Sequence, residues 1–143
     1  MITNPQTAAD IMTSDVISVR PTTTIAQARA LMNTHSIRHL PVVDEGDRFV
    51  GVVTQKAMLA EILRITDQFG IQGVASQTEQ RPVSEILGKD VETIQPQLSL
   101  VEAGKFFLEC KHGSLPVLED GRLVGILTSA DFVKLSVALL ERA

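Results

Sequence analysis

The spacing of apolar residues changes along the chain, and it predicts short strands that alternate with helices. Two β-branched runs, residues 16–19 and 91–94, are each followed two residues later by a proline. Proline has no N–H to donate, so it ends a strand ladder. Apolar residues then recur three and four positions apart in the segments that begin at Ile25 and Leu100, which is typical of an amphipathic helix. The pattern therefore predicts a strand and then a helix, twice.

Hydroxyl residues mark where these helices begin. Thr24 and Gln27, and again Ser99 and Glu102, have the spacing of a capping box, in which two side chains satisfy free backbone N–H groups of the first turn. Two adjacent apolar runs follow each helix, and turns rich in aspartate and glycine separate them. The runs predicted as strands are residues 40–43, 49–53, 115–118 and 123–127.

A second helix follows each pair of strands. Thr54 and Thr128 directly follow the strands and are predicted as N-caps. We expect the last helix to extend to about Arg142, because apolar residues recur at helical spacing up to Leu140.

These elements form an internal repeat. When the chain is shifted by 75 positions, with one residue deleted at the turn between the strands, thirteen identities align. They are Ile11/Ile86, Asp15/Asp90, Val16/Val91, Pro21/Pro96, Ala28/Ala103, Leu40/Leu115, Pro41/Pro116, Val42/Val117, Gly46/Gly121, Arg48/Arg122, Val50/Val124, Gly51/Gly125 and Thr54/Thr128.

The repeat predicts an α+β fold of two β-α-β-β-α units related by a pseudo-twofold axis. Residues 1–64 form the first unit with its N-terminal segment, and residues 82–143 form the second. Residues 65–81 contain glycines and a polar run, so we interpret them as a linker. Because neither unit can cover its apolar faces alone, we expect the two to pack into one globule.

Composition and charge exclude several classes of partner. Apolar residues make up 44% and charged residues 21%, as in globular proteins. The net charge of -4 argues against nucleic acid, because phosphate binding needs clustered Lys and Arg, and no Trp or Tyr is present for base stacking. No apolar run approaches the ~20 residues of a membrane span, and no secretory signal is visible. We therefore expect neither nucleic acid nor a membrane as a partner.

The single cysteine, Cys110, excludes an intramolecular disulfide, which fits a reducing cytoplasm. We expect a cytoplasmic protein in which Cys110 is a small buried thiol at a helix end. The three histidines are scattered and do not form a zinc pattern. His35 and His112 are expected at helix ends.

The ordered motifs resemble the CBS-domain family, named after cystathionine β-synthase. The first copy carries DIMT at residues 10–13, IRHLPVVD at residues 37–44 and FVGVVT at residues 49–54. The second carries LPVLE at residues 115–119 and LVGILTSAD at residues 123–131. Each motif is weak alone, but the set occurs twice in the same order and covers nearly the whole chain.

This resemblance implies a tandem CBS pair, also called a Bateman module, similar to the stand-alone members of the family. Such pairs usually dimerise through their helices, so a homodimer is expected. They bind adenosine compounds such as AMP, ADP, ATP or S-adenosylmethionine between the repeats and regulate another protein, which the sequence does not identify. The resemblance therefore implies a regulatory module with no cofactor beyond such a ligand.

Asp131 is the residue most suited to hold a ribose. It follows Thr128 by three positions, matching the family's T-x-x-D, whose aspartate holds the ribose and whose threonine faces the phosphates. A carboxylate suits a ribose diol because both its oxygens accept hydrogen bonds. The alternative is structural: Thr128 would be the N-cap, and Asp131 would complement the dipole of the helix. In the first copy Ala57 takes the position of Asp131, so we expect one competent cleft per chain.

Other candidates come from the positions before the L-P dipeptide of each copy. In nucleotide-binding relatives, polar or basic side chains there contact phosphates, which makes Arg38 and His39 candidates in either cleft; a solvated strand start is the alternative. Lys89 is a weaker candidate. The remaining ligand-binding candidates belong to the second copy and are Thr93, Ser114, Leu115 and Pro116.

No catalytic motif is present in the sequence, since it has no G-x-S-x-G, no Walker lysine and no H-E-x-x-H. We therefore expect a protein that is not an enzyme. A module that binds no small molecule and serves only in dimerisation or protein interaction remains the alternative to a ligand sensor, and Ala57 favours it.

Overall fold

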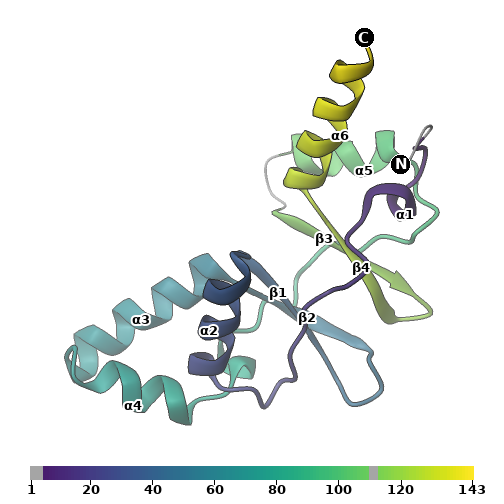
Figure 1. The fold of residues 1–143 in the computed structure, drawn as a ribbon. Coiled ribbons are helices and arrows are strands. Elements are labelled where there is room, and N and C mark those ends of the chain that lie inside the picture. Colours follow the sequence, from purple (N-terminus) through teal and green to yellow (C-terminus); the bar gives the residue numbers. More distant parts are fainter. Residues whose placement is uncertain (1–4, 110–112) are drawn as a thin grey trace. The chain divides into compact units, whose positions relative to one another are not determined.

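The computed structural model describes residues 5–109 and 113–143, which form two compact units (Figure 1). Unit 1 contains the described residues up to Val16 together with Glu92–Ala143, and unit 2 contains Ile17–Val91. Each unit combines one antiparallel pair of strands with helices. The α+β prediction with two similar units is therefore confirmed.

Unit 2 holds most of the first sequence repeat. Its two strands pair antiparallel, with His39 opposite Thr54 and a bulge between Val42 and Val43. A helical hairpin of α3 and α4 follows the strands, and α4 also contacts α2 (Figure 1). The elements are α2 (Ile25–His35), β1 (His39–Val43), β2 (Phe49–Thr54), α3 (Gln55–Phe69), α4 (Gly73–Gln80) and the 3-10 helix η1 (Val83–Ile86).

Unit 1 repeats this plan with the second half of the chain. Its strands pair with Ser114 opposite Thr128 and meet at a two-residue turn, Asp120-Gly121. Both turn residues have positive φ (54° and 79°), which fits the turn chemistry predicted from the sequence. The elements are α1 (Ala8–Ile11), α5 (Leu100–Leu108), β3 (Ser114–Glu119), β4 (Arg122–Thr128) and α6 (Ser129–Arg142).

Each unit also contains a segment that belongs, in sequence, to the other repeat. We call residues 5–16 and 82–91 the crossing segments. In unit 1 the N–H of Thr13 donates to the carbonyl of Ile126 at 2.9 Å, and the N–H of Ile126 donates back at 3.0 Å. In unit 2 Val52 and Gly88 exchange the equivalent two bonds at 3.0 and 2.9 Å. Each crossing segment therefore extends the hairpin of the opposite repeat.

Glycine is required where a crossing segment passes over a hairpin. A Cβ on Gly51 would lie 2.5 Å from the carbonyl oxygen of Gly88, and a Cβ on Gly125 would meet the Met12 sulfur. The V-G pair shared by both repeats therefore marks the point of close approach.

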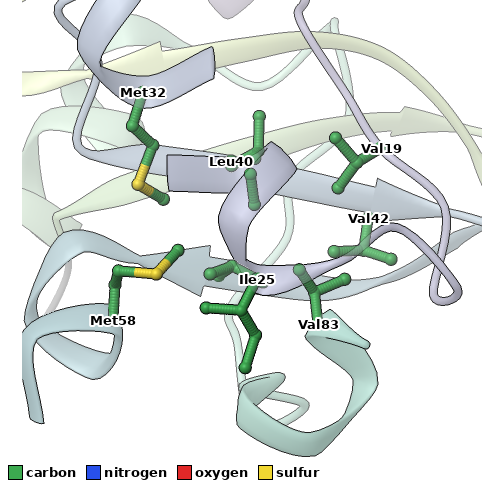
Figure 2. Close-up of a cluster of buried hydrophobic side chains, with 9 residues drawn as sticks. Val19, Ile25, Met32, Leu40, Val42, Met58 and Val83 are labelled. Carbon is green, nitrogen blue, oxygen red and sulfur yellow. The ribbon is translucent and has the colours of Figure 1, made fainter. Parts of the chain in front are cut away.

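The two units have separate hydrophobic cores. In unit 2, Figure 2 shows Val83 of η1 beside Ile25 of α2, with Leu40 and Val42 of β1 in the same cluster. In unit 1, Ala8 of α1 is fully buried with residues of α5, β3 and β4. The crossing segments thus supply core side chains as well as hydrogen bonds.

The first strand predicted in each repeat is reduced to a single bridge. Val19 bridges Val42 and Ile94 bridges Val117, both in parallel. Val19 is held by two backbone bonds, from its N–H to Pro41 at 3.0 Å and from the N–H of Val43 at 2.9 Å. The ladder does not continue because a proline follows two residues later. The other predicted strands agree with the structure to within one residue at each end.

The segment interpreted as a linker is largely helical. Helix α3 extends to Phe69, and α4 occupies Gly73–Gln80. The glycines end one helix and precede the next: Gly70 is the C-cap of α3 with φ 77°, and α4 begins at Gly73. The compact units also divide the chain at residues 16/17 and 91/92 rather than in this segment, because the crossing segments pack on the opposite repeats.

The predicted caps are present with one difference. Thr24 and Gln27 form the reciprocal capping box, and Thr54 accepts from the N–H of Ala57 at 3.0 Å. Ser99 accepts from the N–H of Glu102, but the Glu102 carboxylate pairs with Lys105 at 3.1 Å instead of returning to the cap. His35 ends α2 as expected, whereas the predictions for Cys110 and His112 fall outside the described residues.

Candidate functional site

Asp131 lies in the first turn of α6 and is buried, with 8% of its surface exposed. Its Oδ2 accepts from the backbone N–H of Thr128 at 2.9 Å and from the Thr128 hydroxyl at 3.4 Å. The structural role considered for this pair is therefore present. Because both contacts use Oδ2, Oδ1 retains accepting capacity for a further group.

Asp131 also lines an open groove of about 360 Å³ within unit 1. The groove lies between the crossing segment that contains α1 and one face of α6. Residues three or four positions apart lie on the same face of a helix. This spacing brings together positions 131, 134, 135, 138 and 142. The lining residues are Pro5, Asp10, Ile11, Met12, Asp131, Lys134, Leu135, Ala138 and Arg142.

The groove combines charged rims with apolar surface. Asp10 and Asp131 supply carboxylates, whereas Lys134 and Arg142 supply cations. Hydrogen bonds from the backbone N–H of Gln6 and then of Thr7 lower the pKa of Asp10, so this carboxyl is ionised at neutral pH. The groove can therefore hold a ligand that has hydroxyls, an apolar ring and an anionic group.

The equivalent positions in unit 2 hold different side chains. Ala57 replaces Asp131 and Ala60 replaces Lys134. Glu61, in the place of Leu135, binds Arg64 and also contacts Arg81 at 3.1 Å. The hydrogen bond from Arg64 is the main cause of the lowered pKa of Glu61, and both arginine charges add to it, while partial burial opposes it. An internal ion-pair network thus stands where unit 1 has its groove.

Three of the other predicted residues lie on β3, beside the start of α6. Ser114 is buried and pairs with Thr128 across the hairpin. Leu115 and Pro116 are fully buried, and the Pro116 carbonyl accepts from Ile94 at 3.0 Å. Thr93 lines a separate groove of about 420 Å³ next to Phe106 of α5. Of the predicted residues in unit 1, Asp131 alone lines the α1–α6 groove.

Arg38 and His39 lie in unit 2. His39 begins β1 opposite Thr54, and the carbonyl of Arg38 accepts from the N–H of Gln55 at 2.8 Å. Burial lowers the pKa of His39, and the charge of Arg38 lowers it further. The imidazole is therefore neutral at pH 7, and Arg38, which is exposed, supplies the cationic charge at this position. Lys89 is exposed in the crossing segment of unit 2.

Two segments of the chain match the model of the CBS domain, residues 8–64 and 83–138. The chain belongs to the CBS-domain family. Each matched segment contains one antiparallel pair of strands with its helices. The tandem pair predicted from the repeat is therefore confirmed.

Curated relatives of several kinds are similar to this chain over most of its length. The CBS domain-containing protein YhcV of Bacillus subtilis is 33% identical over 85% of this chain and 79% of its own length. Inosine-5′-monophosphate dehydrogenase of Methanocaldococcus jannaschii is 30% identical over 89% of this chain. The chain spans 23% of that dehydrogenase and 65% of the chloroplastic protein CBSX1 of Arabidopsis thaliana.

Solved CBS pairs share the fold over nearly the whole chain. A putative acetoin utilization protein, AcuB, from Vibrio cholerae is 33% identical, with a TM-score of 0.80 over 96% of this chain and 95% of its own. CBSX2 in complex with AMP is 29% identical, with a TM-score of 0.77 over 93% and 97%. The pair of protein MJ0100, in complex with 5′-methylthioadenosine and S-adenosyl-L-methionine, is 25% identical, with a TM-score of 0.71 over 90% and 98%. CBSX2 and MJ0100 thus each hold adenosine compounds.

The sequence did not point to the groove residues Asp10 and Lys134. Asp10 follows Thr7 by three positions, as Asp131 follows Thr128, and both pairs form capping boxes. This shared T-x-x-D spacing was the available signal for Asp10. Lys134 could be found only by asking which residues share the α6 face of Asp131, since nothing in the CBS motifs marks it.

Neither a metal cluster nor a membrane helix is found in the described part of this CBS pair. Residues 5–109 and 113–143 contain no group of three or more His, Cys, Asp or Glu side chains placed to hold a metal ion. Among the same residues, no helix has the length and apolar character needed to cross a membrane.

Proposed function

We propose that this protein is a regulatory module that binds an adenosine-containing ligand in the α1–α6 groove and is not itself an enzyme. The observation that carries the proposal is the position of Asp131, which is buried, lines the groove and keeps one carboxylate oxygen clear of its cap. The bound AMP of CBSX2 and the bound adenosine compounds of MJ0100 support the choice of ligand class.

The groove offers contacts for two parts of an adenosine compound, its ribose and its base. The Asp131 carboxylate accepts the hydroxyls of the ribose. Met12, Ile11 and Leu135 provide apolar surface for the base. The groove volume of about 360 Å³ is within the range of small-molecule sites, which begins at about 300 Å³. Ser114 and Thr128 support the start of α6 from the neighbouring strand ends. In this proposal Thr93, Leu115 and Pro116 support the fold around the site.

Each chain carries one such site. In unit 2 Ala57 offers no acceptor for a ribose, and the ion pairs of Glu61 with Arg64 and Arg81 occupy the corresponding surface. The difference follows from the side chains of α3 and α6 and from Arg81, which follows α4, a helix that has no counterpart in unit 1.

Regulation would act through α6 and through a second copy of the chain. Apolar side chains are exposed at equivalent positions of α3 and α6: Leu59 and Leu63 on α3, Val133 and Val137 on α6. A homodimer would remove these side chains from water. A ligand that contacts both α1 and α6 then shifts the dimer toward the conformation that binds the ligand more tightly. A regulated partner protein binds that conformation in preference to the other.

The test is ligand titration of Asp131 variants. Asp131→Asn keeps an oxygen for the Thr128 cap but loses the charged pair of acceptors, whereas Asp131→Ala loses both. Calorimetric titration with AMP, ADP, ATP and S-adenosylmethionine should give binding to the parent chain and at least tenfold weaker binding to Asp131→Asn, since a hydrogen bond to a charged group contributes about 1.5–3 kcal/mol.

Asp67→Asn is the matched control, because Asp67 is an exposed aspartate of α3 outside the groove. It should bind like the parent. Equal affinity of the parent and Asp131→Asn for every adenosine compound that binds would refute the site.

A module without a small ligand is the second candidate, and the exposed apolar residues of α3 and α6 favour it. Thermal unfolding separates the two functions. A ligand present at 100 times its Kd stabilises the folded state by about 2.7 kcal/mol, so a sensor shows a raised Tm with at least one adenosine compound. An unchanged Tm with all of them would favour the interaction module.

A further inference from the structure

The two crossing segments are joined to their hairpins by matching backbone bonds. The N–H of Thr13 donates to the carbonyl of Ile126 at 2.9 Å, and the reverse bond is 3.0 Å long. The N–H of Gly88 donates to the carbonyl of Val52 at 2.9 Å, and the reverse bond is again 3.0 Å long. Thr13 and Gly88 occupy equivalent positions of the two repeats. What distinguishes the two segments therefore lies outside these bonds.

In unit 2, charged side chains hold the crossing segment against α3. Glu61 of α3 binds Arg64 on the same helix and also Arg81 at 3.1 Å, and Arg81 directly precedes the crossing segment. The hydrogen bond with Glu61 raises the pKa of Arg64, and the charge of Glu85, within the crossing segment, raises it further. We call these four residues the ionic clamp.

In unit 1 the equivalent positions cannot form this clamp. Three of the four hold uncharged side chains, namely Gln6, Leu135 and Ala138. The fourth holds Asp10, whose carboxylate accepts hydrogen bonds from the backbone N–H groups of its own segment at 2.8 and 3.0 Å. The groove of about 360 Å³ lies between this crossing segment and α6, where unit 2 has its ion pairs.

The crossing segments also differ in the side chain that each contributes to its core. Ala8 and Val83 occupy equivalent positions, and both are fully buried. The larger side chain of Val83 removes more apolar surface from water. Both the missing clamp and the smaller core residue leave the crossing segment of unit 1 less firmly held than that of unit 2.

We propose that the crossing segment of unit 1 is a strap that opens locally in the free protein, and that a ligand in the α1–α6 groove closes it. The ligand then takes the place that the ionic clamp has in unit 2. Residues of the strap line one side of the groove and α6 lines the other, so a ligand contacts both. Binding therefore lowers the population of the open form. The role of the ligand rests on the proposed function, whereas the comparison of the two segments does not.

Hydrogen exchange of two matched amides tests the strap. The protection factors of Thr13 and Gly88 correct for intrinsic exchange rates, and NMR measures both in one sample. In the free protein Thr13 should be less protected than Gly88 by at least about tenfold, since local opening exposes it. AMP at 100 times its Kd should raise the protection of Thr13 by up to about 100-fold, because it binds only the closed form. The protection of Gly88 should change less than about twofold.

Transplanting the ionic clamp into unit 1 tests the same inference without a ligand. The triple variant Gln6→Arg, Leu135→Glu and Ala138→Arg gives unit 1 the charged side chains of unit 2, and Asp10 already stands at the fourth position. In the absence of AMP, the protection of Thr13 should rise toward that of Gly88. AMP should then raise it little further, since the strap is already closed.

Removing the ionic clamp from unit 2 is the reverse test. Glu61→Leu combined with Arg64→Ala should lower the protection of Gly88 toward that of its counterpart in unit 1. Lys105→Ala is the matched control, because it breaks the pair with Glu102, which has the same three-residue spacing but lies within α5 alone. This control should leave the protection of both amides unchanged.

The outcomes separate the strap from the function on which its closure rests. Equal protection of Thr13 and Gly88 in the free protein, or no effect of the transplanted clamp, would show that the strap is wrong while the adenosine site at Asp131 stands. Equal slowing of both amides by AMP would also contradict the strap. If the parent chain binds no adenosine compound, the proposed function is wrong and closure by such a ligand is wrong with it.

Discussion

At the scale of single residues, Glu61 distinguishes unit 2 from unit 1. Its carboxylate joins α3 to the end of α4 through Arg81, and its pKa is lowered mainly by the hydrogen bond from Arg64. A lowered pKa in the folded state stabilises the fold above the ordinary pKa of about 4.5, and this contribution is lost as the pH falls through the folded value. Stability from this network should therefore decrease on acidification.

Glu61→Gln tests this dependence. At pH 7 the variant should unfold with a free energy lower by up to about 1 kcal/mol, because pairs this close to the surface contribute little. At a pH below the lowered folded-state pKa of Glu61, the difference from the parent should disappear, since Glu61 is then protonated in both states. Urea unfolding at both pH values measures it. Glu79→Gln, an exposed change on α4, is the control, and a difference that persists at low pH would contradict the account.

Residue roles were predictable where neighbours in sequence determine them. The Thr128–Asp131 spacing predicted both a cap and a ligand role, and the cap is present with a 2.9 Å hydrogen bond. The groove residues Asp10 and Lys134 were not predicted, because their relation depends on a crossing segment from the other end of the chain. Residue spacing within a helix does not show which distant segment lies over it.

At the scale of elements, the crossing segments require the glycines beneath them. Gly51→Ala places a Cβ against the Gly88 carbonyl, which is fixed by its bond from Val52 N–H, and it should lower the free energy of unfolding by about 1–3 kcal/mol, as overpacking does. Gly125→Ala should cost less, because the Met12 side chain that it meets is flexible. Chemical denaturation of both variants measures which one loses more free energy of unfolding.

Met12→Ala provides the control for this pair. Added to Gly125→Ala, it should recover part of the lost stability by removing the side chain that the new Cβ meets. The same substitution added to Gly51→Ala should recover nothing, since that contact lies in the other unit. A larger loss for Gly125→Ala than for Gly51→Ala would contradict the proposed contacts.

Elements were predicted well where local signals agree and less well where glycine was ambiguous. The four long strands and the final helix match because alternating apolar residues, turn glycines and hydroxyl caps coincide. The polar sequence of α4, which begins with Gly73, predicts a linker rather than a helix. Its helical state depends on packing against α2 and α3, which local propensity does not contain.

At the scale of the whole molecule, the homodimer proposed above predicts a defined response to charge. Leu63 and Val137 occupy equivalent positions of α3 and α6 and are 71% and 49% exposed. Leu63→Glu combined with Val137→Glu should convert dimer to monomer, because burying two unpaired carboxylates at an interface is costly. Light scattering coupled to size exclusion measures the mass.

Gln68→Glu adds charge to α3 at an exposed polar position and should leave the dimer intact. Circular dichroism should be the same for all variants, since the substituted side chains lie outside both cores. A parent chain that is already monomeric at high concentration would contradict the proposed homodimer.

The tandem organisation was predictable from the thirteen aligned identities, but the composition of each unit was not. Sequence repeats follow the order of the chain, whereas the units exchange their crossing segments. The exchange becomes visible only through the paired backbone bonds of Thr13 with Ile126 and of Val52 with Gly88.

The exchanged segments also limit how such a gene can change. Removing one copy of the duplication would delete one hairpin. It would also delete the crossing segment that pairs with the hairpin of the other copy. The remaining half would keep a crossing segment without the hairpin on which it packs. Its own hairpin would lose the crossing segment that covers Gly51 or Gly125. Folding of either hairpin therefore needs both copies in the chain, even though their side chains differ, as Ala57 and Asp131 do.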